Sequence, residues 1–298
     1  MRTSSPKTLL GTKRGRPSVG AVGILLADLA PLRQHQPTQP SHVIPQPSGA
    51  GHSGIGLAIV HSLCQQFSGD VLLTALDAAQ GHAAVQQLQA EDLSPCFHLL
   101  DICKQQSIRA LRDFLLKEYG GLDVLVNNAG INFNGRVVNV SSTLSLIALK
   151  RCSPELQQKF TSENITEEEL VELMNKFMEH TKNGVHLKES WPPMKFVPYA
   201  VSKVGLTVLS RIQARKLSER KTGDKILLNS CCPRWVRTDM GGAEALKSPE
   251  GGAETPVYLA LLPSNAEGLQ GEFVSEKKVV KWEPDSELPA WLQLYGTL

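Results

Sequence analysis

The spacing of hydrophobic residues changes repeatedly along the chain. From Gly54 onward, segments with apolar residues at helical spacing alternate with short runs rich in β-branched residues. The pattern predicts helices over residues 55–66, 80–90 and 107–119, and strands over residues 71–75, 97–100 and 124–127. Such alternation is typical of a parallel sheet with helices on both faces, so the sequence predicts an α/β fold with a doubly wound parallel sheet.

The second half of the chain continues this pattern around a helical insertion. After GRVVNVSS come a long helix and two strands, predicted over residues 198–219, 225–229 and 272–275. Ahead of the long helix, Thr166 and Glu169 form a capping box, and Leu170, Leu173 and Phe177 recur behind it at helical spacing. The order of elements fits a Rossmann-type fold that carries an inserted helix.

The connection between the strands LDVLVN and RVVNVS is unusually short. Only residues 128–135 separate them, whereas a crossover between parallel neighbours needs at least about 10 to 12 residues and normally carries a helix. The dipeptide Asn134-Gly135 favours a tight hairpin, which would make the two strands antiparallel. We expect instead that RVVNVS keeps a parallel place, that one strand-connecting helix is missing, and that an apolar face of the sheet is left uncovered.

The first 48 residues differ in composition from the rest. Basic residues face a single acid, Asp28, and prolines crowd residues 37–47, so we predict a disordered extension over 1–48, a folded domain over 49–282 and a tail over 283–298. The apolar run from Val19 to Leu32 is a weak targeting signal that Asp28 interrupts. HVIPQPS precedes a glycine-rich loop, and its two prolines predict a damaged first strand.

Composition excludes several classes of function. A chain of 298 residues with 41% hydrophobic content is long enough to bury a core, and the net charge of +2 gives no sign of nucleic-acid binding. No apolar run is long enough to cross a membrane, so we expect a cytoplasmic protein. The six cysteines show no CxxC pair and no metal-ligand spacing, which predicts reduced thiols and no metal.

Tyr199, Lys203 and Ser142 form the candidate chemical site. Tyr199 and Lys203 are four residues apart, so on a helix their side chains share one face. A phenol donates its proton near neutral pH only if its pKa falls from about 10, and a nearby ammonium favours the phenolate. Ser142 would donate a hydrogen bond to the same carbonyl oxygen. The pattern indicates carbonyl reduction; the alternative is a surface tyrosine and a solvated lysine.

Several longer motifs surround these residues. They are GIGLAIV, GDVLLTA, LDVLVNNAG, GRVVNVSS, SPELQQKF, ITEEELV, LTVLSRI, GDKILLN, WVRTDM and GAETPVYLALLP. In these motifs the chain resembles the short-chain dehydrogenase/reductase superfamily and, within it, the cytosolic NADPH-dependent carbonyl reductases. The resemblance implies that Ser142, Tyr199 and Lys203 are catalytic. Ser142 and Tyr199 are 57 positions apart. The insertion between them is similar to one in the carbonyl reductases that covers a surface used by relatives to oligomerise, so the resemblance implies a monomer.

The same resemblance implies a coenzyme-binding set. Its members are Gly51, Gly54, Ile55 and Gly56 in the phosphate loop, Asp101 and Ile102 at the adenine, Asn128 at the adenosine ribose, Lys203, and Val236 and Thr238 near the carboxamide. Glycines at a helix N-terminus let backbone amides approach a pyrophosphate. Each member also has an ordinary interpretation as a turn residue, a strand end or a loop residue.

The chain departs from its family in three places that bear on the coenzyme. No Lys or Arg occurs between Arg33 and Lys104, and Leu76 and Gln80 stand where relatives bind the 2′-phosphate of NADPH through arginines. Asp77 either binds a ribose 2′-hydroxyl, so that NADH binds as well, or caps the next helix. Arg234 replaces a glycine, and its side chain either intrudes on the nicotinamide or points to solvent. The short connection also lacks the family's relay asparagine.

Two classes of function follow. The first is NADPH-dependent reduction of a small ketone, aldehyde or quinone by hydride transfer, with Tyr199 as proton donor, Ser142 orienting the oxygen and Lys203 tuning Tyr199. The second is a catalytically silent variant, of the kind that alternative splicing produces, acting as a binding or regulatory protein. The missing crossover and the lost basic residues favour the second, and the retained motifs favour the first.

Overall fold

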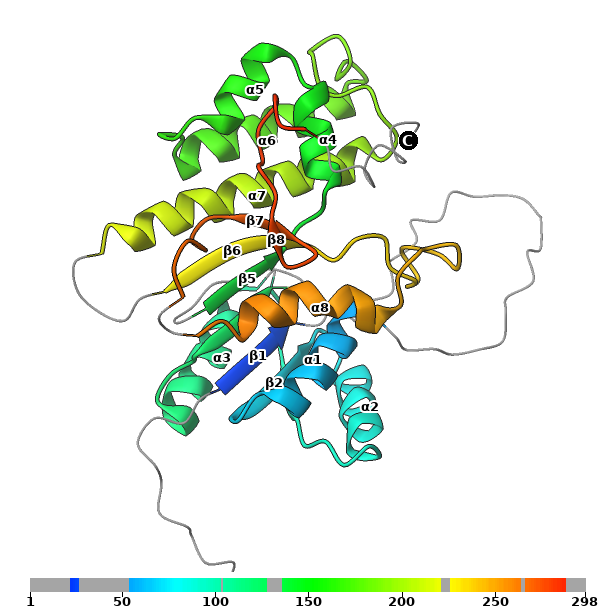
Figure 1. Ribbon diagram of the computed structural model, residues 1–298, viewed down its shortest axis with the longest axis vertical. Coiled ribbons are helices and arrows are strands. Elements are labelled where there is room, and N and C mark those ends of the chain that lie inside the picture. The colour runs from blue at the N-terminus through cyan, green and yellow to red at the C-terminus, as the bar shows by residue number, and fades with distance from the viewer. Residues whose placement is uncertain are drawn as a thin grey trace, which may run out of the picture.

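The computed structural model describes residues 22–26, 54–102, 104–127, 136–220, 226–263 and 266–287. The chain forms one eight-stranded sheet in the order β3-β2-β1-β4-β5-β6-β7-β8, with helices on both faces (Figure 1). The strands are β1 Val22–Leu26, β2 Asp70–Ala75, β3 Cys96–Leu99, β4 Val124–Asn127, β5 Arg136–Val140, β6 Leu227–Cys232, β7 Phe273–Ser275 and β8 Lys278–Val279. The strands from β3 to β7 are parallel, and β8 is antiparallel to β7, which confirms the predicted doubly wound sheet.

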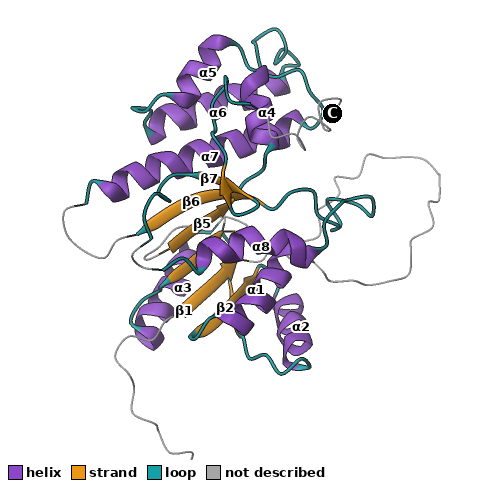
Figure 2. Cartoon of the chain, in the orientation of Figure 1, coloured by secondary structure: helices purple, strands orange, loops and turns teal. Residues whose placement is uncertain are grey.

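The helices divide between the two faces of the sheet and an upper layer (Figure 2). They are α1 Ile55–Gln66, α2 Ala78–Gln89, α3 Gln105–Tyr119, α4 Leu144–Arg151, α5 Pro154–Thr161, α6 Glu167–Lys182, α7 Val197–Ser218 and α8 Pro249–Ala260. Side chains of α1, α2 and α8 pack on one face of the sheet in a single apolar core. α3 packs on the other face, and α7 packs there together with the insertion helices.

The central strand β1 comes from a part of the chain that composition assigned to an extension. Val22–Leu26 pairs with β2 on one side and with β4 on the other, and Figure 1 shows it in the middle of the sheet. The expectation of disorder over 1–48 is therefore wrong for these five residues. The prolines of HVIPQPS do not damage this strand, because VGILL fills the central position. The rest of 1–48 lies outside the described residues.

β4 and β5 are parallel neighbours, as expected, and the hairpin alternative is wrong. Their register aligns Val124 with Arg136 and Asn127 with Asn139, and no described element lies between them. Eight extended residues reach at most about 26 to 29 Å, while the return along strands of this length needs only about 15 Å. The expected bare apolar face is absent from the described strands, because Leu125 is 4% exposed and Val137 is 1% exposed.

The insertion forms α5 and α6, which pack over α7. The predicted capping box is present: the Thr166 hydroxyl accepts from the Glu169 amide, and the Glu169 carboxylate accepts from the Thr166 amide. Leu170, Leu173 and Phe177 are buried in one cluster, where the Phe177 ring lies 4.9 Å from that of Trp191. Aromatic pairs at this spacing stabilise a cluster beyond the area they bury, so the insertion is a firm support for α7.

Removal of β1 tests its place in the sheet. A truncated chain that begins at Ser48 would leave the facing backbone groups of β2 and β4 without partners in the centre of the sheet, where such groups are expensive. We expect it to be insoluble or to lose its cooperative thermal transition in circular dichroism. A chain that begins at Val19 keeps the strand and is the control. Equal solubility and equal melting of the two truncated chains would contradict this role of β1.

Candidate active site

Hydrogen bonds at the carboxyl end of β5 fix the position of α7. The Lys203 ammonium donates to the carbonyl oxygen of Val140, the last residue of β5, at 2.9 Å. The hydroxyls of Ser141 and Thr207 lie 3.1 Å and 2.9 Å from the Lys203 carbonyl oxygen and 2.7 Å from each other. Strand and helix are therefore joined by backbone and side-chain contacts on both sides of Lys203.

The three predicted catalytic residues meet at this junction. Ser142 follows β5, is 9% exposed and hydrogen-bonds the Tyr199 hydroxyl through its own hydroxyl. The Lys203 nitrogen lies 5.6 Å from the centre of the Tyr199 ring. The Ser142 hydroxyl also accepts from the amide of Leu144 at 3.2 Å, in the first turn of α4. Two hydroxyl groups and one ammonium thus lie at the carboxyl edge of the sheet.

Burial is the main electrostatic influence on this site. It raises the pKa of Tyr199, and the hydrogen bond from Ser142 only partly offsets that effect. Burial also lowers the pKa of Lys203, against the attraction of the neighbouring Cys231 and Cys232. Both shifts favour the neutral form of the group. The sequence predicted that Lys203 depresses the pKa of Tyr199; in the structure burial is the main influence on that pKa and raises it.

A ladder of buried polar side chains supports the site from below. The Asn127 amide donates to the Asn139 side-chain oxygen at 2.7 Å, and the Asn139 amide donates to the Ser210 hydroxyl at 2.8 Å. The Ser210 hydroxyl donates in turn to the Leu206 carbonyl oxygen at 2.7 Å. Sequence reasoning missed this ladder. Its one signal was the pair of asparagines in otherwise apolar strands, VLVN and VVNV.

The glycine-rich loop residues that the structure describes lie at the start of α1. Gly54 is the N-cap, Ile55 and Gly56 open the helix, and a side chain at Gly54 would meet no atom within 4 Å. The amides of such a first turn have no partner within the helix, so they suit an anion. Gly51 lies outside the described residues, and so does Asn128.

Asp77 and Asp101 have local structural roles. The Asp77 carboxylate caps α2 by accepting from the Gln80 amide at 2.8 Å, which confirms the capping alternative. Asp101 forms an ion pair with Lys104 at 3.0 Å. Ile102 packs against the apolar cluster under α3. All of them follow the carboxyl ends of β2 and β3, where a dinucleotide binds in folds of this kind.

The loop after β6 is held in place by its own contacts. Val236 bridges to Lys247, and the Thr238 hydroxyl accepts from the Gly241 amide at 3.1 Å. Arg234 adopts a left-handed backbone with φ of 75°, and its side chain is 12% exposed. Its guanidinium pairs with Glu276 at 3.2 Å, in the turn between β7 and β8. Arg234 is thus committed to an ion pair inside the fold, which neither of the two expected orientations anticipated.

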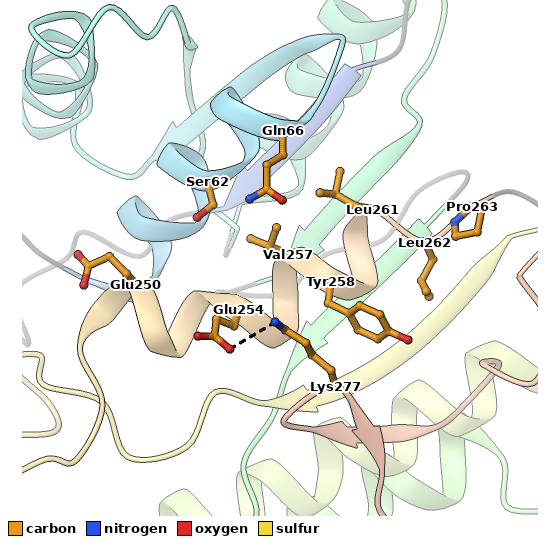
Figure 3. Close-up of a pocket in the computed structure, with 10 residues that line it drawn as sticks. All are labelled: Ser62, Gln66, Glu250, Glu254, Val257, Tyr258, Leu261, Leu262, Pro263 and Lys277. Atoms are coloured by element: carbon orange, nitrogen blue, oxygen red, sulfur yellow. Dashed lines mark ion pairs between the residues drawn. The ribbon is translucent and has the colours of Figure 1, made fainter.

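A surface cavity of 340 Å³ lies away from these residues, between α1 and α8 (Figure 3). Glu254 and Lys277 form an ion pair of 3.4 Å at one side, and Val257 and Tyr258 line the floor with Leu261. Figure 3 shows Ser62 and Gln66 approaching from α1. None of the lining residues belongs to the catalytic junction, so the cavity is separate from the candidate site.

The described part of the chain contains no cluster of His, Cys, Asp or Glu able to hold a metal ion. Across the same residues, no helix is both long and apolar enough to span a membrane. Cys64, Cys96, Cys152, Cys231 and Cys232 are free thiols, as the cysteine spacing predicted.

Replacement of Asn139 tests the polar ladder. Asn139→Leu keeps the approximate volume but removes the hydrogen bonds that join Asn139 to Asn127 and to Ser210, at about 1 to 3 kcal/mol for a buried group that loses its partner. We expect urea denaturation to show a loss of unfolding free energy in that range or above. Asn164→Leu, at an exposed position ahead of α6, is the matched control. An equal loss of unfolding free energy in both variants would mean that the ladder does not contribute to stability.

The chain is similar to a known family of enzymes over most of its length. Residues 49–143 match the family model for short chain dehydrogenase. Carbonyl reductase [NADPH] 1 of Bos taurus is 63% identical over 267 residues, with 78% of this chain and 95% of the relative covered. The protein of the same name from Homo sapiens is 63% identical over 268 residues, with 78% and 96% covered. Both alignments are longer than the 78% of this chain that they cover, so they contain residues of the relatives that have no counterpart in this chain.

Solved structures agree on the fold. Salutaridine reductase from Papaver somniferum has a TM-score of 0.68 at 22% identity, covering 85% of this chain and 99% of that one. Menthone neomenthol reductase from Mentha piperita has a TM-score of 0.65 at 23% identity, covering 87% and 99%. Identities this low show the fold alone, while the curated relatives show the family. The chain belongs to the short-chain dehydrogenase/reductase superfamily and, within it, to the carbonyl reductases.

Proposed function

We propose that this protein reduces the carbonyl group of small ketones, aldehydes or quinones, with a reduced nicotinamide coenzyme, NADPH in the relatives' names, as hydride donor. The observation that carries the proposal is the junction of Ser142, Tyr199 and Lys203 at the carboxyl end of β5. The comparisons give no support to the alternative of a binding or regulatory protein. An alcohol or hydroquinone is the product.

The three side chains divide the work at the carbonyl oxygen. A bound reduced nicotinamide supplies the hydride that adds to the carbonyl carbon. Tyr199, kept protonated by burial, donates its hydroxyl proton to the oxygen as negative charge develops there. When the substrate binds, the Ser142 hydroxyl turns its one proton from the Tyr199 oxygen to the carbonyl oxygen and donates a second hydrogen bond there. Hydrogen bonding at two points fixes the oxygen in place before proton transfer.

Lys203 is suited to a second role besides stabilising charge near Tyr199. An ammonium has three N–H donors, and among the described residues one of them is used on the Val140 carbonyl oxygen. The remaining donors are available for the ribose hydroxyls of the coenzyme. The start of α1, with Gly54, Ile55 and Gly56, is the matching place for the pyrophosphate. Val236 and Thr238 are proposed contacts of the carboxamide, and Asp101, Ile102, Gly51 and Asn128 of the adenosine half.

Apolar side chains favour an apolar substrate. Phe196 is 66% exposed immediately before α7, three residues ahead of Tyr199, and Met240 is 73% exposed in the loop after β6. Trp235, in the same loop, is 40% exposed and is anchored by a bond from its indole N–H to the Gly241 carbonyl oxygen at 2.8 Å. Aromatic and thioether groups are among the side chains that line sites for apolar ligands.

We also propose a cytoplasmic monomer made of one reductase domain. The domain includes Val22–Leu26 in addition to the predicted range 49–282. The proposed tail from 283 begins with ordered contacts, because Lys150 donates to the Pro284 carbonyl oxygen at 2.5 Å. α5 and α6 cover α7. This supports a monomer, because the resemblance implies that relatives without the insertion use the covered surface to form oligomers.

Turnover in the Tyr199→Phe variant tests the function. We measure loss of reduced nicotinamide absorbance with a small quinone, for NADPH and for NADH. Removal of the phenolic hydroxyl removes general acid catalysis, so we expect a fall of about 10²- to 10⁴-fold in kcat. Ser202→Ala, at an exposed position on the same helix, is the control and should keep the original rate. Equal rates in Tyr199→Phe and the original chain would refute the assignment.

The pH dependence of turnover tests the electrostatics. Burial raises the pKa of Tyr199 above its ordinary value, so the phenol stays protonated and able to donate through neutral pH. We expect kcat/KM for reduction to be flat from about pH 6 to about pH 9 and to fall only at higher pH. A descending limb centred near neutral pH would instead mean that the ammonium of Lys203 overrides burial. Circular dichroism at each pH controls for unfolding.

A further inference from the structure

The adenosine end of the proposed coenzyme site differs in charge from what a 2′-phosphate requires. In doubly wound folds the residues after the second strand meet the adenosine ribose: an acid binds the 2′-hydroxyl of NAD, and an arginine accommodates the 2′-phosphate of NADP. Here β2 ends at Ala75, and Leu76, Asp77 and Gln80 follow it into the first turn of α2. This turn is therefore a place at which the two coenzymes can be distinguished.

Positive charge is absent from this end of the described chain. No Lys or Arg occurs over the described residues 54–102, and Leu76 presents a side chain that is 54% exposed. The next lysine, Lys104, is engaged with Asp101 at 3.0 Å. Phosphate groups in proteins are bound through charge-assisted hydrogen bonds, most strongly by arginine. The described residues at this end of the site do not fit the 2′-phosphate.

Two hydrogen-bond acceptors occupy the same turn. The Asp77 carboxylate accepts from the Gln80 amide at 2.8 Å, so a negative charge already occupies the positive N-terminus of α2. The side-chain oxygen Oε1 of Gln80 is buried and has no hydrogen-bond partner among the described residues. Gln80 carries no charge, so its side chain does nothing to neutralise a phosphate. A ribose 2′-hydroxyl carries a proton to donate, whereas a phosphate dianion carries none and is repelled by Asp77.

We infer that this protein has lost the selection for a 2′-phosphate and binds NADH at least as tightly as NADPH. The inference rests on the proposed function, because it concerns the same coenzyme site. Asp77 and Gln80 are the residues that determine this specificity, and Leu76 is the position at which a cation is missing. The names of the relatives support NADPH as a coenzyme of this chain, and the turn after β2 adds NADH as a second one.

Direct binding tests the inference without requiring turnover. The full chain is titrated with NADH and with NADPH, and Kd is obtained from nicotinamide fluorescence or calorimetry. We expect the Kd of NADH to be equal to or below that of NADPH. A lower Kd for NADPH would overturn the inference and leave the proposed function standing. Failure of both coenzymes to bind would overturn the proposed function and the inference with it.

A charge-restoring variant gives the second measurement. Leu76→Arg combined with Gln80→Arg places two guanidinium groups at the turn, and we expect the Kd of NADPH to fall on the order of tenfold or more relative to that of NADH. Gln86→Arg combined with Gln87→Arg adds the same charge at exposed positions of α2, about 10 Å further along the helix, and should leave the ratio unchanged. Adenosine 2′,5′-bisphosphate competing more strongly than adenosine 5′-monophosphate against the original chain would also overturn the inference.

Discussion

The parallel pairing of β4 with β5 is the constraint on which the rest of the structure depends. Its register places Asn127 opposite Asn139, and the amide of Asn139 reaches Ser210 on α7. The carboxyl end of β5 then receives the Lys203 ammonium. A hairpin would have reversed β5 and moved its carboxyl end to the opposite end of the strands, away from Asn127. Loss of a helix from the connection is tolerated because the strands are short and the return path is within reach of eight residues.

Desolvation, more than attraction between charges, sets the protonation of the site. Burial disfavours both a phenolate at Tyr199 and an ammonium at Lys203. Tyr199 therefore stays protonated, but it is a weaker acid than a tyrosine whose pKa is lowered by a nearby ammonium. General acid catalysis is most effective when the pKa lies near the working pH. The hydrogen bond from Ser142 favours the phenolate and so partly offsets the effect of burial on the pKa of Tyr199.

Local pattern predicted the elements well, and tertiary pairing decided the rest. The bounds of α1 and β4, the capping box of α6 and the place of Tyr199 on a long helix were readable because each depends on neighbours in sequence. β1 was not readable, because VGILL lies far from the helix that follows it and only its partners β2 and β4 identify it as a strand. The contacts of Asn139 and Arg234 join residues from distant strands and turns, so no local signal specifies them.

The two ends of the proposed coenzyme site are physically independent. β1 and β4 separate β2 from β5, so the turn after β2 lies about 14 Å across the sheet from the junction at Tyr199. That distance exceeds the screening length of about 8 Å at physiological ionic strength. A change of charge at Leu76 or Gln80 therefore has little effect on the pKa of Tyr199. The fold can alter its choice of coenzyme after β2 and keep its chemistry after β5, because different contacts hold each end.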